Sequence, residues 1–228
     1  MKTQFFEQYG NEIEFQNNSE VIGKLANIDC SVPARTRGRK SSHRERYCLR
    51  IYLMQLSQNG LLKFPLKIIK EEAPDFLILC RDETIALEVI DASTEDYQRA
   101  MTELTKSPVG TLLESGTNKL VKHGERLIGE GWKGNSVEVE WVDSILNSIK
   151  NKTEALNQTH FKIANRYELL IYDNSHLSVM LHVKDSLPLL KKAINEKLTG
   201  NCFKKNFNSI SIIHSNLLLY DIGNNDLS

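Results

Sequence analysis

Two short apolar runs, at residues 76–80 and 85–90, are separated by only four polar residues, Arg81-Asp82-Glu83-Thr84. Both runs are rich in Ile, Leu and Val, and runs of this length on either side of a polar tetrapeptide are typical of a β-hairpin. A hairpin constrains the chain strongly, because the side chains of each strand alternate between the two faces of the sheet. The side of the sheet on which a charged residue lies can therefore be predicted from its position.

Two acids occupy such positions: Asp75, at the head of the first run, and Glu88, in the middle of the second. A turn centred between residues 82 and 83 would pair residue 75 with residue 90 and residue 77 with residue 88. Asp75 and Glu88 then share a face of the sheet, whereas a one-residue slip in register would separate them.

Carboxylates on one face repel each other, and a divalent cation between them is the usual resolution. Ligands that are all oxygen favour Mg²⁺ or Mn²⁺. The hairpin therefore predicts a Mg²⁺ (or Mn²⁺) site at Asp75 and Glu88. The alternative is that Glu88 faces solvent on a half-exposed sheet and that Asp75 only caps a turn after Pro74.

Composition sets the wider bounds. The 228 residues carry 29 basic and 29 acidic side chains, which is typical of one soluble domain with a substantial core. No apolar stretch is long enough to span a bilayer, and the first residues lack the apolar region of a signal peptide, so we expect no membrane association and a cytoplasmic location. The four cysteines are too scattered for a zinc ribbon or a disulfide framework.

A helix is predicted after a polar and basic N-terminal extension at residues 1–40. Ser41 or Ser42 can cap this helix, and Asn59-Gly60 ends it. On the helical wheel, Glu45 lies on one stripe with Cys48, Leu49, Tyr52 and Leu56. Glu45 is either a first-turn acid stabilised by the helix dipole or a third carboxylate aimed at the sheet.

Basic residues gather where the extension meets this helix. The cluster consists of Arg35, Arg37, Arg39, Lys40, His43, Arg44, Arg46 and Arg50, with Glu45 as its single acid. Such a cluster can hold the phosphates of a nucleic acid without reading sequence, and we expect this of Arg35, Arg37, Arg39, Lys40 and Arg44. The alternative is a solvated basic arm.

A second informative helix is predicted from about residue 138 to residue 156, after a long loop insertion at about residues 106–135. Lys152 lies within roughly 20° of Trp141 and Ile145 on the wheel, so it belongs to the apolar stripe. If it reaches Glu88 or Asp75, its ammonium could stabilise charge that develops on a phosphoryl oxygen or position an attacking water. The alternative is a lysine whose stem snorkels to the surface.

The remaining chain alternates between strands and helices. Strands are predicted at 64–70 and 167–173, helices at 91–104 and 185–198, and a C-terminal hairpin at 210–213 and 217–220. The fold class is therefore α/β, with a mixed central sheet flanked by helices on both faces. No Gly-rich nucleotide loop and no Gly-x-Ser-x-Gly turn follow a strand, which argues against a kinase, a dinucleotide enzyme and an α/β-hydrolase.

The order of these elements, within a single domain at residues 41–228, resembles the restriction-endonuclease-like αβββαβ core of the PD-(D/E)XK nuclease superfamily. The motifs that carry the resemblance are Glu72-Ala73-Pro74-Asp75-Phe76, Ala86-Leu87-Glu88-Val89, Ile149-Lys150-Asn151-Lys152 and Leu169-Leu170-Ile171-Tyr172-Asp173. The resemblance implies cleavage of phosphodiesters with Mg²⁺. It also implies that Asp75 and Glu88 are metal ligands, that the Val89 carbonyl is a further ligand, and that Glu45 is an added metal-site acid.

The chain departs from the superfamily pattern at Ile90, which stands where the lysine of the (D/E)-x-K tripeptide would be. Some members supply this lysine from a neighbouring helix, and the wheel position of Lys152 allows that role here. The chain looks most like small bacterial members that also lack the third-strand lysine, over roughly residues 40 to 222.

Three hypotheses follow. The first is a metal-dependent nuclease that acts on DNA or RNA through Asp75, Glu88, Lys152 and Glu45. The alternative is a catalytically degenerate nuclease-fold module that binds nucleic acid or a protein partner, which the Ile90 substitution favours. The third is a structural salt-bridge cluster around Lys152. A homodimer is left open.

Overall fold

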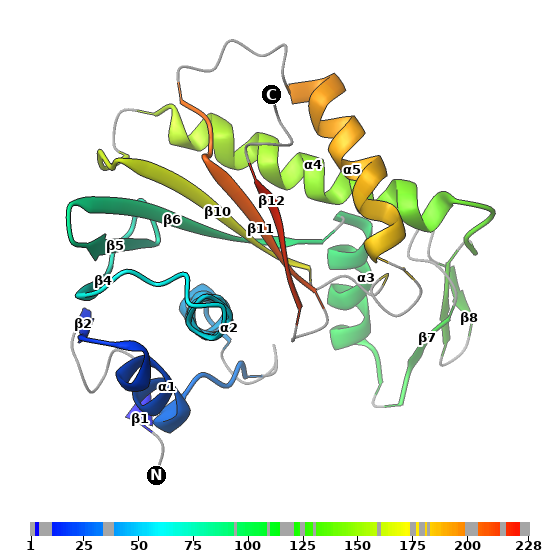
Figure 1. Ribbon diagram of the computed structural model, residues 1–228. Coiled ribbons are helices and arrows are strands. Elements are labelled where there is room, and N and C mark those ends of the chain that lie inside the picture. The colour runs from blue at the N-terminus through cyan, green and yellow to red at the C-terminus, as the bar shows by residue number, and fades with distance from the viewer. Residues whose placement is uncertain are drawn as a thin grey trace.

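A seven-stranded mixed sheet forms the centre of the computed structural model, with helices on both of its faces (Figure 1). The structure describes residues 3–4, 11–33, 39–93, 95–108, 110–114, 121–123, 126–129, 131–158, 161–173, 177, 181, 183–198, 205–214 and 218–223. Within these residues the predicted α/β class, with a mixed sheet between helices, is confirmed.

The strands lie in the order β12-β11-β10-β6-β5-β4-β2. Their bounds are Glu12–Phe15 (β2), Leu66–Lys70 (β4), Phe76–Cys80 (β5), Glu83–Ala92 (β6), Arg166–Asp173 (β10), Ser209–His214 (β11) and Leu218–Gly223 (β12). β6 pairs antiparallel with β5 and parallel with β10, so it is central to the sheet. The predicted C-terminal hairpin is present as the antiparallel pair β11 and β12.

The helices form two layers. On one face of the sheet lie α4 (Ser136–Leu156) and α5 (Val183–Leu198), over a core that includes Trp141. On the other face lie α1 (Asn18–Asn27) and α2 (Ser41–Gln58), over a core that includes Phe76. α2 agrees with the predicted helix, but no serine caps it: the Lys40 backbone N–H donates to Nδ1 of His43 at 3.0 Å.

The predicted hairpin exists, with a register that differs from the expectation by two residues. Phe76 pairs with Leu87 and Cys80 pairs with Glu83, so the turn is centred between residues 81 and 82. Since the difference is an even number, every side chain keeps its predicted face. Extending the observed register by one pair places Asp75 directly opposite Glu88.

The N-terminal region is not the loosely attached extension that its polar composition suggests. β2 pairs antiparallel with β4, and Ile13 and Phe15 in it are buried. Val21 and Leu25 of α1 are buried as well, on the face that α2 shares. Together with Ile28 and Cys30, these residues form a buried apolar face that holds an otherwise polar segment against the sheet.

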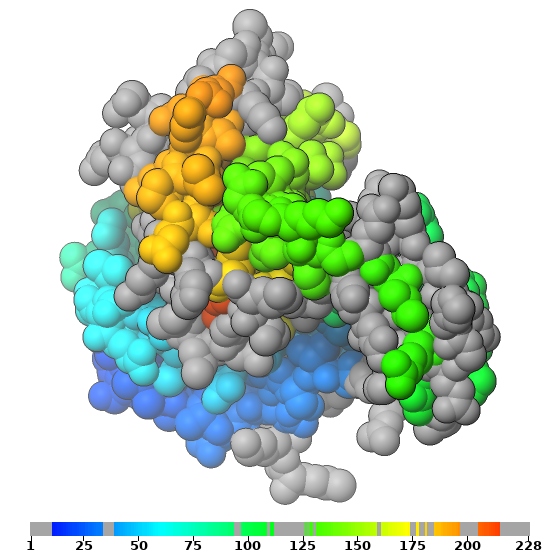
Figure 2. Space-filling model, turned by 90° about the vertical axis from the view of Figure 1, so that its right-hand side faces the viewer, coloured from blue at the N-terminus to red at the C-terminus, as the bar shows by residue number. Residues whose placement is uncertain are grey.

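The segment predicted as a long loop contains a separate small sheet. It is preceded by α3 (Glu95–Lys106), which begins later than expected because β6 continues to Ala92. Its strands are β7 (Leu112–Glu114), β8 (Val121–His123) and β9 (Arg126–Ile128), in the order β7-β9-β8. Figure 2 shows this part of the chain standing out from one side of the molecule, next to the start of α4.

Two smaller features complete the fold. A short parallel pair joins β1 (Thr3–Gln4) to β3 (Ile28–Asp29). Among the described helices, none is long and apolar enough to cross a membrane.

Candidate active site

The two carboxylates of the hairpin lie side by side at the start of β5. Asp75 immediately precedes β5, and its Oδ2 accepts a hydrogen bond from the Val89 backbone N–H of β6 at 2.8 Å. Glu88 precedes Val89 in β6. By the alternation of strand side chains, it lies on the same face as Ala86 and Ile90, which is the face that α4 covers. The side chains of Asp75 and Glu88 are only 14% and 6% exposed. The predicted shared face of these two acids is confirmed.

Lys152 of α4 reaches this pair. Its Nζ lies 2.5 Å from Glu88 Oε2, and its side chain remains 27% exposed. The helix directs the lysine inward because Lys152 continues the stripe that buries Trp141 and Ile145 against the sheet. The wheel position predicted this contact, and the ammonium is not merely snorkelling to solvent.

The environment favours the neutral form of both acids. Burial raises the pKa of Glu88 to about 7, and repulsion from Asp75 adds to the effect, while the Lys152 ammonium opposes it. Burial also raises the pKa of Asp75, with a further contribution from Glu45, whereas the Val89 N–H and two lysines act in the other direction. An additional positive charge beside the pair would therefore stabilise its ionised form.

Glu45 approaches from the opposite face of the sheet. Its Oε2 lies 3.0 Å from Nζ of Lys70, the last residue of β4, and Lys70 Nζ lies 3.7 Å from Asp75 Oδ1. Lys70 also donates to the backbone carbonyls of Glu71 and Asp75, at 2.8 and 3.0 Å. Glu45 is thus connected to Asp75 through a lysine and does not join the pair directly.

The three carboxylates expected to share a metal ion, those of Asp75, Glu88 and Glu45, do not meet at one point. In the part of the chain that the structure describes, no group of three or more His, Cys, Asp or Glu side chains is placed to hold a metal ion. The oxygens available at one point are those of Asp75 and Glu88. The Val89 carbonyl is a further donor on the same side, because the N–H and C=O of a strand residue point toward the same neighbouring strand.

Lys70 was missed by the sequence reasoning, although a signal for it exists. Leu66 and Ile68 are inward-facing residues of β4, and Lys70 continues their alternation. Alternation fixes the direction of a strand side chain as the helical wheel fixes that of Lys152, so the inward position of Lys70 follows from the sequence. Ile90, in the motif position of the missing lysine, is half-buried and packs against the α4 side of the core.

The predicted phosphate-binding residues are placed in part. Arg44 forms an ion pair with Asp91 of β6. Arg39 and Lys40 line a small cavity beside it, of about 250 Å³. Arg35 and Arg37 lie outside the described residues.

These features meet in one cavity of about 480 Å³. Asp75, Val89 and Lys152 line it from one side, and Arg44 and Glu45 line it from α2. The cavity lies where β5 begins, since Asp75 immediately precedes that strand. Of the predicted catalytic and metal-binding residues, Glu88 is not in the lining, and it contacts the cavity through Lys152 and Asp75.

Comparison with protein-family models, with curated proteins and with solved structures finds no match for this chain. Its function is therefore inferred from the geometry of the site itself.

Proposed function

We propose that the chain is a phosphodiester hydrolase that depends on a divalent metal ion and acts on DNA or RNA. The observation that carries the proposal is the contact between Lys152 and Glu88, beside Asp75, at the wall of a cavity that Arg44 also lines. Burial raises the pKa of both carboxylic acids, so their ionisation lowers the stability of the fold. Acids perturbed in this way are typical of functional sites.

The residues present fit the metal that the family resemblance implies. Asp75, Glu88 and the Val89 carbonyl offer oxygen donors only, which suits Mg²⁺ or Mn²⁺, and the raised pKa values mark a place where positive charge is favourable. When bound, such an ion would polarise a phosphoryl oxygen and lower the pKa of a water molecule. Glu45 would act at a distance, through Lys70.

The chain's own residues have separable roles in this proposal. Lys152 holds Glu88 partly ionised near neutral pH, and because its side chain is partly exposed, its ammonium can turn to a phosphoryl oxygen. Arg39, Lys40 and Arg44 hold the flanking phosphates of the strand. Lys70 fixes the backbone ahead of β5, so that Asp75 stays against Val89.

Cleavage assays test the proposal. Purified protein with Mg²⁺ or Mn²⁺ is incubated with single- and double-stranded DNA and RNA, and we expect cleavage that EDTA, Asp75→Asn and Glu88→Gln abolish. Glu83→Gln, on the same strand but paired with Lys63, is the matched control and should cleave normally. Intact substrates, or cleavage that survives both site variants, would reject the hydrolase.

A second candidate function is binding without cleavage. Ile90 in the lysine position favours it, as does the lack of a three-acid cluster among the described residues. It predicts DNA or RNA binding that weakens with salt but is unaffected by divalent metal and by Glu88→Gln.

A further inference from the structure

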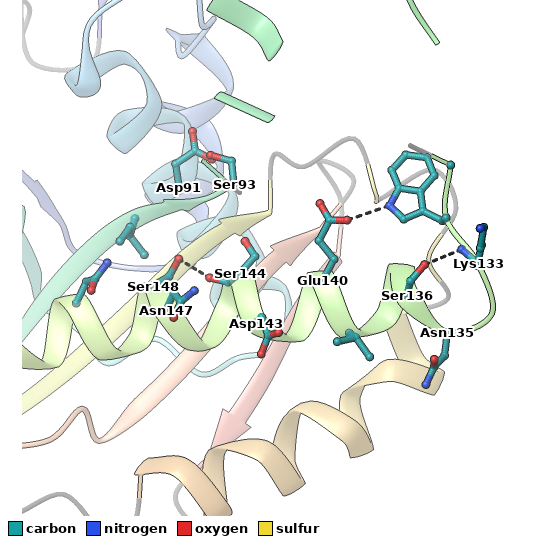
Figure 3. Close-up of a pocket in the computed structure, with 15 residues that line it drawn as sticks. Asp91, Ser93, Lys133, Asn135, Ser136, Glu140, Asp143, Ser144, Asn147 and Ser148 are labelled. Carbon is teal, nitrogen blue, oxygen red and sulfur yellow. Dashed lines mark hydrogen bonds between the residues drawn. The ribbon is translucent and has the colours of Figure 1, made fainter. Parts of the chain in front are cut away.

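A second and larger cavity, of about 1190 Å³, adjoins the candidate active site (Figure 3). It shares Ile90, Asp91 and Ser93 with the smaller cavity that Lys152 lines. Asn151, the neighbour of Lys152 in α4, lines it too. A strand whose phosphate lies near Lys152 could therefore place an adjoining group in this larger cavity.

Three buried polar atoms at this cavity have no hydrogen-bond partner within the described chain: Asp91 Oδ1, Glu140 Oε1 and Ser144 Oγ. The Asp91 side chain is 7% exposed, and Ser144 is also 7% exposed. Buried polar atoms are nearly always paired in folded proteins, so these atoms favour a polar ligand. Figure 3 shows Glu140 and Ser144 on the side of α4 that faces Asp91.

The charge of the lining argues against a phosphate as that ligand. Among the described residues, the lining carries three carboxylates, from Asp91, Glu140 and Asp143, and one ammonium group, from Lys133. The Arg44 guanidinium pairs with Asp91 from outside this lining, so the acids still exceed the cations by one. The other polar side chains of the lining are amides, hydroxyls and the Trp132 indole. Such a surface suits a neutral group that donates hydrogen bonds.

Two of the unpartnered atoms are carboxylate oxygens, which can only accept. Cytosine, adenine and guanine carry an exocyclic amino group that donates, whereas thymine and uracil present a carbonyl instead. Trp132 adds an aromatic surface to the cavity, and its indole is oriented by a 2.9 Å hydrogen bond from Nε1 to Glu140 Oε2. Aromatic side chains beside hydrogen-bonding groups are typical of sites that bind unpaired bases.

We propose that this cavity binds an unpaired nucleobase that carries an exocyclic amino group, from a nucleotide next to the cleaved phosphate. The inference rests on the proposed function and deepens it, because it names single-stranded or locally unpaired nucleic acid as the substrate. In a duplex, the amino group of the base is engaged with its complement and the base is stacked, so it could not enter the cavity.

Binding without metal tests the inference separately from catalysis. The probes are fluorescent oligodeoxycytidylate and oligothymidylate, with oligocytidylate and oligouridylate as the RNA pair, and affinity is measured by fluorescence anisotropy in EDTA. Each pair compares two pyrimidines, so stacking differs little and the amino group differs most. We expect the cytosine polymer to bind about tenfold more tightly, which corresponds to one good base contact.

Glu140→Gln sharpens the test. The single oxygen of the new glutamine amide must still accept the hydrogen bond from the Trp132 N–H. The amide NH₂ group, a donor, then takes the place of the unpartnered Oε1 acceptor in the cavity. The preference for cytosine should disappear or reverse. Ser144→Ala, which removes only a hydroxyl, should weaken cytosine binding about fivefold. Glu154→Gln, exposed on the same helix, should keep the preference of the unmodified protein.

Two results would overturn the inference: equal affinity within both pairs, or an unchanged cytosine preference in both Glu140→Gln and Ser144→Ala. Cleavage assays in Mg²⁺ then separate the two proposals. A cytosine preference in a protein that never cleaves would support the base cavity and reject the hydrolase. Cleavage in a protein without any base preference would support the hydrolase and reject the base cavity.

Discussion

The stability of the fold should depend on pH through Glu88 in a direction opposite to that of an ordinary salt-bridged acid. Its pKa is raised from 4.5 to about 7 by burial and by Asp75. Because the folded state binds this proton more tightly than the unfolded state, ionisation of Glu88 destabilises the fold. The stabilisation that protonated Glu88 gives to the fold is fully present below pH 4.5. It is lost as pH rises from 4.5 through about 7, and the stability then no longer changes through this group.

The size of the effect follows from the shift. At ~1.36 kcal/mol for each pKa unit, a change from 4.5 to about 7 corresponds to about 3 kcal/mol in the free energy of unfolding. Glu88→Gln resembles the neutral acid in shape and cannot ionise. The variant should therefore gain about 3 kcal/mol relative to the unmodified protein between about pH 4 and about pH 8.

Urea denaturation in EDTA across this pH range measures the difference, and any constant offset between the two proteins cancels. Glu83→Gln is the control on the same strand, because the Lys63 ammonium holds the pKa of Glu83 below its usual range. Its relative stability should change in the opposite direction, falling as pH rises. A Glu88→Gln curve that runs parallel to that of the unmodified protein, or falls below it with rising pH, would refute the reasoning.

The remaining predictions concern the groups around Glu88. Near pH 8, Mn²⁺ at about 100 times its dissociation constant should raise the stability of the unmodified protein by about 2.7 kcal/mol, and a thermal-shift assay should show no such rise in Asp75→Asn. Lys152→Met should lower cleavage by about 10²-fold or more and destabilise the fold more at high pH than at low pH, since Glu88 loses its counter-charge; Lys150→Met, exposed on the same helix, should change neither. Lys70→Met should leave Asp75 facing Glu45 without a cation between them, so its unfolding midpoint in urea should fall more steeply with rising pH than that of the unmodified protein; parallel curves for the two proteins would contradict this role.

The parts of the site that lie on regular periodic elements could be predicted from the sequence. Asp75 and Glu88 share a face because strand residues alternate, and an error of two residues in the register left that result intact. Lys152 was found because the wheel of a long amphipathic helix fixes its direction.

The parts that depend on contacts between distant segments could not be predicted in the same way. Glu45 lies on the inward stripe of α2, but the wheel cannot tell that α2 and α4 cover opposite faces of the sheet, with Lys70 between Glu45 and Asp75. β2 is short and polar on one side, and its place in the sheet follows from pairing with β4, more than 50 residues away by the register of Phe15 with Leu66. The small sheet of β7, β8 and β9 has only three residues in each strand, too few to show a period.

The most direct test of the metal-dependent site is the anomalous diffraction of a crystal soaked in Mn²⁺. We predict a manganese peak in contact with the carboxylates of both Asp75 and Glu88, and no peak there in Glu88→Gln crystals soaked in the same way. A well-ordered crystal with no peak at these residues, and with Lys152 still paired to Glu88, would contradict the account and leave the cluster as a structural salt bridge.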